Sequence, residues 1–425
     1  MYLSRAPDVG RPAPGTGRRW GKVAPNVVFL GLTSLFTDIS SEMVNAILPL
    51  YLTFELRWTP LQFGVFDGFY QGVAGLLRLA GGLVADRRRR YKEVAAAGYG
   101  LSALCKLGLL AVGNGWVAIT AVLFADRTGK GIRTAPRDAL VSLSSPAAAL
   151  GWAFGVHRAL DTIGAMAGPL LAFVILTVVP GAFDLVFVIS FCAAVVGLGI
   201  LGLFVENRVP GPASPGVSRP PSLRRALGLL RDRRFRAVVM AGALLSLATV
   251  SDAFVYLTLQ RQTDLRLGYF PVLYVGTAAV YLLLAAPVGR LADRAGRGRV
   301  LLAGHLLLFG VYALLLQPRL GAAGVVAGLA LLGVYYAATD GVLMALVSSV
   351  VPADIRTSGL AVVATAVAAA RLVASVLFGA VWTWAGPTAA LRWFSVGLVG
   401  ALVAAAVLLR NQPGTRDEGQ PATAG

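Results

Sequence analysis

The chain has 425 residues, of which 57% are hydrophobic and only 14% are charged. A soluble domain is usually about half apolar and about a quarter charged, so a soluble protein could not bury this much apolar surface. The net charge of +18 would fit a nucleic-acid-binding protein. However, the charges lie in short segments between long apolar runs rather than on one basic face, which excludes that class. We therefore expect an integral membrane protein.

Twelve apolar runs are long enough to cross a bilayer, which takes about 20 residues. The first run is too long for the apolar core of a signal peptide, so we expect it to be retained as a span. The sequence predicts spans at 26–54, 60–84, 94–113, 115–143, 149–179, 183–205, 237–259, 270–289, 299–317, 320–350, 357–385 and 388–410.

These spans form two groups of six, separated by one polar and basic segment. The predicted fold is all-α, with twelve transmembrane helices in two pseudo-symmetric six-helix bundles. The expected organisation is a basic N-terminal tail at 1–25, a first bundle at 26–205, a linker at 206–236, a second bundle at 237–410 and a C-terminal tail at 411–425.

The lysines and arginines predict the orientation of the chain in the membrane. With the N-terminus inside, the inner segments carry 27 of these residues and the outer loops carry five. Cytoplasmic loops are enriched in Lys and Arg, so we expect both tails and the linker in the cytoplasm of a cell whose inner membrane holds the chain. The basic clusters are also expected to contact anionic lipid headgroups.

The two groups of spans repeat short motifs at a nearly constant offset. Gly-Leu-Val-Ala-Asp-Arg at 82–87 matches Gly-Arg-Leu-Ala-Asp-Arg at 289–294, an offset of 207. Ala-Leu-Val-Ser at 139–142 recurs at 345–348, an offset of 206. Two independent matches indicate a duplicated six-helix unit, which is how many transporter folds are built.

The repeated loop pattern, Gly-x-x-x-Asp-Arg-x-Gly-Arg, resembles the loop signature of the major facilitator superfamily. The first copy keeps Gly82, Asp86 and Arg87 but has Arg89 where that family favours glycine. The glycine lets two helices approach closely, and the aspartate can pair with an arginine or cap a helix, which would hold one face of a transporter shut. The intact second copy consists of Gly289, Asp293, Arg294, Gly296 and Arg297.

The fifth span contains a second family pattern. Gly164, Gly168 and Pro169 form a Gly-x-x-x-Gly-Pro motif that resembles the one in the drug/proton antiporter branch of the superfamily, although Ala172 and Phe173 follow where further glycines are usual. Such spacing allows close helix contact and the proline would bend the helix, so an ordinary packing seam is the alternative. The resemblance implies a secondary transporter and leaves its substrate open.

Ionisable side chains inside apolar spans are functional candidates because burying them costs a few kcal/mol. Asp38, Glu42 and Asn45 have helical spacing and lie on one face near the middle of the first span. The two carboxylates form a candidate protonation site, or else a structural pair with a cation of a neighbouring helix. Arg127 resembles the arginine that many antiporters of the family hold in the fourth helix, which implies Asp38 as its partner. Lys130 and Arg133 could attract anionic substrates or extend to the headgroups, and extension to the headgroups is the favoured arrangement for Arg133.

The start of the fifth span holds His157, Arg158 and Asp161. The i, i+4 spacing of His157 and Asp161 predicts a hydrogen bond. This histidine could titrate near neutral pH or form part of a cytoplasmic gate.

In the second half, Asp252, Asp340 and Arg371 lie within spans, and the last two have opposite charges that could pair. Two histidines and five methionines are too few to suggest a metal site, and we expect neither a metal nor a cofactor.

The leading hypothesis is a monomeric, proton-coupled exporter of small organic compounds that works by alternating access. One alternative is an importer or carrier of an anionic or siderophore-like solute, suggested by Arg127, Lys130 and Arg158. An integral-membrane enzyme would need a convergent catalytic set, and no such spacing is visible. A receptor would normally carry a sizeable soluble domain, and direct drive by ATP would need a nucleotide-binding motif.

Overall fold

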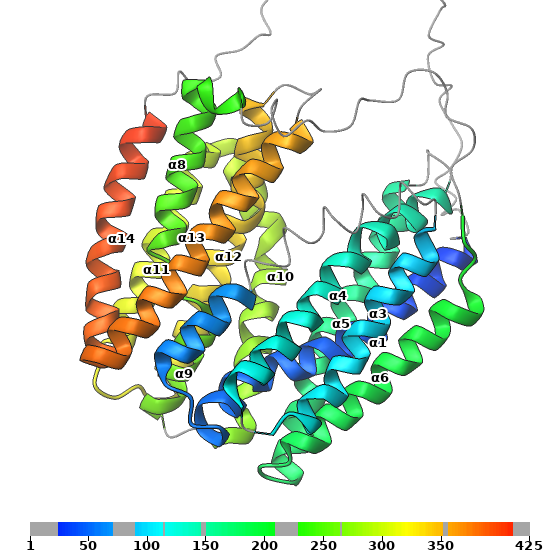
Figure 1. Cartoon of the computed structure of the whole chain (residues 1–425). Helices are drawn as coiled ribbons and strands as arrows, with labels where there is room; N and C mark the ends of the chain where they lie inside the picture. The colour runs from blue at the N-terminus through cyan, green and yellow to red at the C-terminus, as the bar shows by residue number, and fades with distance from the viewer. Residues whose placement is uncertain are drawn as a thin grey trace, which may run out of the picture.

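The computed structural model describes residues 24–70, 90–113, 115–145, 150–208, 228–263, 266–351 and 356–410. Over these ranges the chain is helical, with no β-strand. Figure 1 shows two bundles of helices side by side. The first contains α1 (Pro25–Leu50), a helix that begins at residue 60, α3 (Tyr91–Ala111), α4 (Trp116–Leu143), α5 (Leu150–Val178) and α6 (Phe183–Phe204).

The second bundle repeats this arrangement with one difference in its first span. It contains α8 (Arg233–Leu247), α9 (Asp252–Thr263), α10 (Phe270–Ala295), α11 (Arg297–Leu315), α12 (Ala322–Val350), α13 (Arg356–Ala385) and α14 (Pro387–Arg410). Three short helical turns, η1 (Tyr51–Glu55), η3 (Leu229–Arg231) and η4 (Leu267–Tyr269), flank these helices.

Within the described residues, ten helical segments are long and apolar enough to cross a membrane. Two predicted spans fall outside this set: the helix that begins at residue 60, which is described only to residue 70, and α4. α4 falls short on hydropathy because it is the most highly charged of the long helices. Its ionisable residues are Asp126, Arg127, Lys130, Arg133, Arg137 and Asp138.

The seventh span, predicted as one helix, is instead broken between α8 and α9. Backbone groups freed inside a bilayer must find partners within the protein. Tyr312 of α11 supplies them, because its hydroxyl accepts from the Val250 amide at 2.7 Å and donates to the Ala248 carbonyl at 3.0 Å. One buried tyrosine therefore supports the break, and Asp252 becomes the first residue of α9.

Glycines bring α1 and α5 into close contact, as the Gly-x-x-x-Gly spacing predicts. A side chain at Gly168 would lie 2.7 Å from the Ile39 carbonyl oxygen and 2.8 Å from the Met43 nitrogen. At Gly164 it would lie 2.9 Å from the Cα of Leu35. The two backbones therefore pack with no side chain between them.

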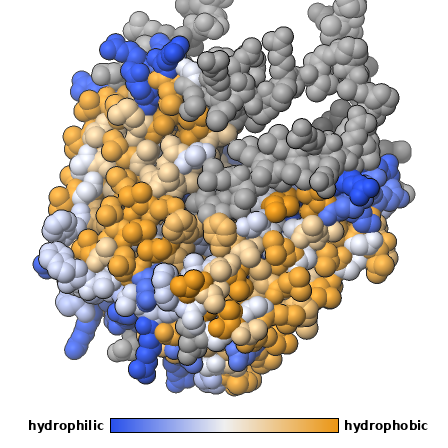
Figure 2. Space-filling model, viewed as in Figure 1, coloured by the Kyte–Doolittle hydropathy of each residue, from blue (hydrophilic) through white to orange (hydrophobic). Residues whose placement is uncertain are grey.

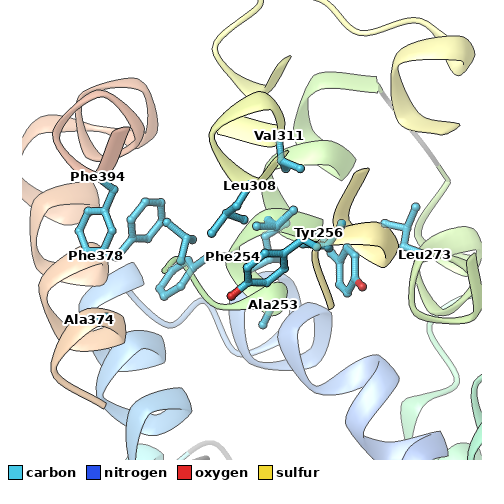
Figure 3. Close-up of a cluster of buried hydrophobic side chains, with 14 of the residues drawn as sticks. Ala253, Phe254, Tyr256, Leu273, Leu308, Val311, Ala374, Phe378 and Phe394 are labelled. Atoms are coloured by element: carbon cyan, nitrogen blue, oxygen red, sulfur yellow. The ribbon is translucent and has the colours of Figure 1, made fainter. Parts of the chain in front are cut away.

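The two bundles meet at the end of the molecule opposite residues 24 and 410 (Figure 1). There the Leu61 amide donates to the Thr383 hydroxyl at 2.9 Å, and the rings of Phe173 and Tyr269 lie 5.3 Å apart. Phe254 forms the centre of an aromatic cluster that closes this end, part of which is drawn in Figure 3. Its ring lies 5.0 Å from that of Phe63, 4.9 Å from that of Phe378 and 5.4 Å from that of Trp382.

The glycine contact predicts different effects for two substitutions in the same helix. Gly168→Ala should destabilise the protein by about 1–3 kcal/mol, because the new methyl group has no space against α1. Gly155→Ala is the matched control, since a side chain there meets nothing within 4 Å. Alanine should leave stability unchanged at that site or raise it by about 0.5–1 kcal/mol. Thermal unfolding of both purified variants in detergent measures the difference, and equal melting temperatures would show that the contact is not tight.

Candidate functional site

A cavity of about 420 Å³ lies where the two bundles meet. α1, the helix from residue 60 and α4 line it from the first bundle, and α9 and α10 line it from the second. Its wall combines charged groups with aromatic rings. The charged residues are Glu42, Asp67, Arg127 and Asp252, and the aromatic residues are Phe63, Phe66, Tyr70 and Tyr274.

Arg127 is held in the wall of this cavity by neutral groups. Its Nη2 donates to Asn45 Oδ1 at 2.6 Å, and its guanidinium carbon lies 3.6 Å from the centre of the Tyr70 ring. The Tyr70 hydroxyl donates to the same Asn45 oxygen. The implied Asp38–Arg127 pair is therefore wrong for this conformation, in which Asn45 holds the arginine.

One turn along α1, Glu42 forms the cavity's own ion pair. Lys130 Nζ lies 3.2 Å from Glu42 Oε1, and Asn45 Nδ2 donates to Glu42 Oε2 at 2.9 Å. Lys130 therefore points toward the carboxylate of α1 and not toward the headgroups. The predicted shared face of Asp38, Glu42 and Asn45 is confirmed, because all three contact α4.

Asp38 lies deeper in the first bundle. Its carboxylate is 3.7 Å from Arg133 Nη2, and the carboxyl group of Asp161 on α5 interacts with it electrostatically. Two neighbouring carboxylates repel each other, which favours a proton on one of them. Arg133 is 3% exposed and lies 4.5 Å from the centre of the Tyr99 ring, so the expectation that it extends to the headgroups is also wrong.

The predicted His157–Asp161 hydrogen bond is replaced by contacts from other helices. His157 Nε2 lies 3.0 Å from the Ser34 hydroxyl of α1. Asp161 instead pairs with Arg137 at 3.4 Å and with Arg158 at 3.0 Å. Helical spacing placed the histidine and the aspartate on one face, but α1 and α4 approach that face closely enough to supply other partners.

In the second bundle, Asp252 accepts a hydrogen bond from the Tyr336 hydroxyl. Asp252 and Asn45 are 207 residues apart, the offset of the repeated loop motif, so the duplication places them in equivalent positions. The predicted Asp340–Arg371 pair is confirmed as a loose one at 3.9 Å. It lines a separate pocket of about 240 Å³ that also includes His305.

The sequence profile of the Major Facilitator Superfamily matches residues 30–280 and 255–424. The chain belongs to the major facilitator superfamily. It is therefore a multi-pass membrane transporter and not an enzyme. An uncharacterized MFS-type transporter of Methanocaldococcus jannaschii is 30% identical over 367 residues, which cover 85% of this chain and 89% of that protein. An uncharacterized protein of Mycobacterium tuberculosis is 31% identical over 64% of this chain and 66% of its own length.

Solved transporters share the fold at low sequence identity. The nucleoside transporter NupG, as its D323A mutant, superimposes with a TM-score of 0.77 at 14% identity, covering 91% of this chain and 99% of that one. A POT family transporter in complex with 5-aminolevulinic acid gives a TM-score of 0.73 at 13% identity, covering 90% and 95%. These likenesses confirm the predicted twelve-helix fold.

The first copy of the superfamily's loop signature, with Gly82, Asp86 and Arg87, lies outside the described residues. The second copy joins α10 to α11. Gly296 at the turn has φ 99°, a backbone conformation that side chains with a Cβ rarely adopt.

Beyond this turn, Asp293 of the second copy pairs with Arg297 at 2.9 Å, and Arg297 Nη1 also donates to the Ala345 carbonyl of α12 at 3.0 Å. Arg294 is exposed. Among the residues that the structure describes, none approaches Gly289 closely, because a side chain there would meet none of their atoms within 4 Å.

A further buried ion pair joins α3 to α4. Lys106 Nζ lies 2.6 Å from Asp126 Oδ1, both side chains are nearly inaccessible, and the Ser102 hydroxyl donates to the same carboxylate. The sequence marks Lys106 as a charge within a span but does not identify its partner. Because the pair lies outside the cavity lining, we assign it to packing of the transporter.

This assignment predicts an effect on stability that a second substitution reverses. Lys106→Met should destabilise the protein by about 3–5 kcal/mol, since it leaves Asp126 charged, buried and without its cation. The double variant Lys106→Met/Asp126→Leu should recover much of that loss. Lys92→Met, at the start of the same helix, is the control and should cost only about 1 kcal/mol, because it removes a hydrogen bond to the Gly202 carbonyl at 2.8 Å but leaves no buried charge unpaired. Thermal unfolding in detergent measures all four proteins, and a double variant no more stable than the single one would contradict the assignment.

Proposed function

We propose that the chain is a proton-coupled secondary transporter that exports small organic compounds by alternating access. The observation that carries this proposal is the cavity shared by the two bundles. Its volume of about 420 Å³ lies in the range typical of small-molecule sites, roughly 300–1,000 Å³. A site between two duplicated bundles is well suited to alternating access, because rocking of the bundles can expose it to either side in turn.

The charges in the wall favour one kind of substrate. Three carboxylates, Glu42, Asp67 and Asp252, line the cavity with one guanidinium, Arg127. Lys130 offsets Glu42, so the site retains a negative balance. Together with four aromatic rings, this balance favours an amphipathic compound that is cationic or neutral. The alternative, an importer or carrier of an anionic or siderophore-like solute, draws its support from Arg127 and Lys130.

The proton site is proposed at Asp38 and Asp161, two neighbouring carboxyl groups of which Asp38 lies 3.7 Å from Arg133 and Asp161 lies 3.4 Å from Arg137. Loss of the proton would leave two neighbouring carboxylates and strengthen the attraction of Asp38 to Arg133. Glu42 and Lys130 lie one helical turn away on the same two helices. A change in the α1–α4 contact at Asp38 would therefore alter the neighbouring contact that lines the cavity. Protonation can bias alternating access if it stabilises the inward-open and outward-open states to different extents.

Export is supported by the form that the molecule takes here. The bundles touch at the end opposite the chain termini, whereas at the other end Asp293 is 62% exposed and no described residue packs closely against Gly289. With the tails in the cytoplasm, as the charge count predicts, this conformation opens to the cytoplasm and can load substrate from the cell. The contact of Gly164 and Gly168 with α1 matches the motif of the antiporter branch.

The coupling proposal predicts distinct effects for three substitutions. Asp38→Asn should abolish transport driven by a pH gradient while leaving passive exchange of substrate largely intact, because it fixes the proton site in a neutral form. Arg133→Gln should impair coupling in the same way, since Arg133 is the cation next to Asp38. Arg127→Gln should instead leave coupling intact and change substrate affinity, because it removes the guanidinium from the cavity wall: organic cations should bind more tightly and organic anions more weakly. Flux and proton uptake in proteoliposomes, across a panel of organic cations and anions, measure both properties.

The control for these variants is Glu42→Gln, which should reduce coupling less than Asp38→Asn. Full pH-driven transport by Asp38→Asn would rule out Asp38 as the coupling site. A panel in which only anions are moved would favour the alternative substrate class.

The orientation makes a separate prediction. Reporter domains fused at Asn411 and inserted within 211–222 should both give cytoplasmic signals. The predicted inner segments carry 27 lysines and arginines, whereas the predicted outer loops carry five. Active alkaline phosphatase at either site, with green fluorescence absent, would contradict the proposed cytoplasmic loading side.

A further inference from the structure

A groove of about 340 Å³ lies on the outer flank of the second bundle, far from the transport cavity. It runs between the start of α8 and the end of α14. Its lining divides into two chemical parts, a set of guanidinium groups and an apolar floor. The residues are Arg233, Arg234, Arg236, Ala237, Met240, Val407 and Leu408.

The order of these residues along α8 matches the layers of a membrane. Arg233 is the first residue of the helix, and Met240 follows seven residues later, about 10 Å further along the axis at about 1.5 Å per residue. Met240 is 46% exposed and Val407 is 58% exposed, so both face the acyl chains in a membrane-spanning bundle. Figure 2 shows hydrophilic side chains gathered at this end of the bundle, above an apolar flank.

Two of the arginines that line the groove, Arg233 and Arg236, form no ion pair with the described residues. Among the described residues, no carboxylate lies within ion-pair distance of Arg233 or Arg236. The nearby carboxylate of Asp232 caps α8, where it accepts from the amides of Arg234 at 2.6 Å and Phe235 at 3.2 Å. Arg236 donates to the Leu230 carbonyl at 3.3 Å, which leaves further donors of its guanidinium for a ligand.

We propose that this groove binds one anionic phospholipid, with its phosphate at Arg233 and Arg236 and an acyl chain along Met240 and Val407. Guanidinium groups bind phosphate oxygens through charge-assisted hydrogen bonds, and basic pockets between transmembrane helices bind anionic headgroups. The lipid bridges α8 to α14 on the outside of the bundle. This site is independent of the proposed transport reaction and of its substrate.

Native mass spectrometry of the purified full-length chain tests the proposal. The lipids are phosphatidylglycerol and phosphatidylcholine with identical acyl chains. The wild-type chain should bind a first phosphatidylglycerol in preference to phosphatidylcholine. Arg233→Gln/Arg236→Gln should weaken that first binding by at least about tenfold, since each arginine near an anionic surface contributes about 1 kcal/mol. Ala237→Trp keeps the arginines but fills the groove, and it should weaken binding as well.

Arg290→Gln/Arg299→Gln is the matched control. It removes two exposed arginines from the same end of the molecule, where they line none of the groove. This control should bind phosphatidylglycerol as the wild type does. Equal weakening in the control, or no effect of Ala237→Trp, would overturn the proposal in favour of diffuse attraction to a basic surface. Competition by soluble glycerol phosphate at the same concentration would overturn it in favour of a simple anion site.

Discussion

The cost of placing charges in a bilayer is the constraint on which the first bundle depends. α4 carries six ionisable side chains, and a charge facing lipid at that depth would be prohibitively unfavourable. Each of the five that point inward has a partner on another helix, so α4 fixes the positions of its neighbours. The contacts are Asp126–Lys106, Arg127–Asn45, Lys130–Glu42, Arg133–Asp38 and Arg137–Asp161.

These contacts require the close packing of α1 on α5. Gly164 lies three residues from Asp161, and it contacts Leu35, which lies three residues from Asp38. A larger side chain at Gly164 would push the helices apart at the level of these two carboxyl groups. The small-residue motif and the proposed proton site are therefore parts of one arrangement, in which packing without side chains brings two carboxyl groups close together.

Much of the fold was predictable from the sequence, whereas the pairing within the site was not. Apolar runs and the duplicated loop motif were sufficient for twelve helices in two bundles. They could not fix the register of α1 against α4. From Asp38 to Asn45 the partners on α4 run backward from Arg133 to Arg127, as expected for antiparallel helices. The implied Asp38–Arg127 pair was displaced from this register by six residues, or about 9 Å along the helix axis.

The register between two helices depends on how their side chains pack. Cations recur every three or four residues along α4, so the sequence alone does not show which of them lies opposite Asp38. By contrast, Asp340 and Arg371 are the main opposite charges within their spans, so their pairing was predictable from sequence alone. The break in the seventh span was missed for a similar reason. It depends on Tyr312, a residue on another helix about 60 positions away, whose hydroxyl satisfies the freed backbone.

That break explains why two equivalent positions of the duplicated halves carry different side chains. Asn45 lies inside the continuous helix α1, where no helix terminus is available to stabilise a charge, and a neutral amide serves both Arg127 and Tyr70. Asp252 begins α9, so its carboxylate lies at the positive end of the helix dipole and accepts from Tyr336. Opening the seventh span therefore makes a carboxylate tolerable at the cavity, although no described cation lies within ion-pair distance of it. The second bundle thus contributes negative charge to the shared cavity, while the paired charges proposed for coupling stay within the first.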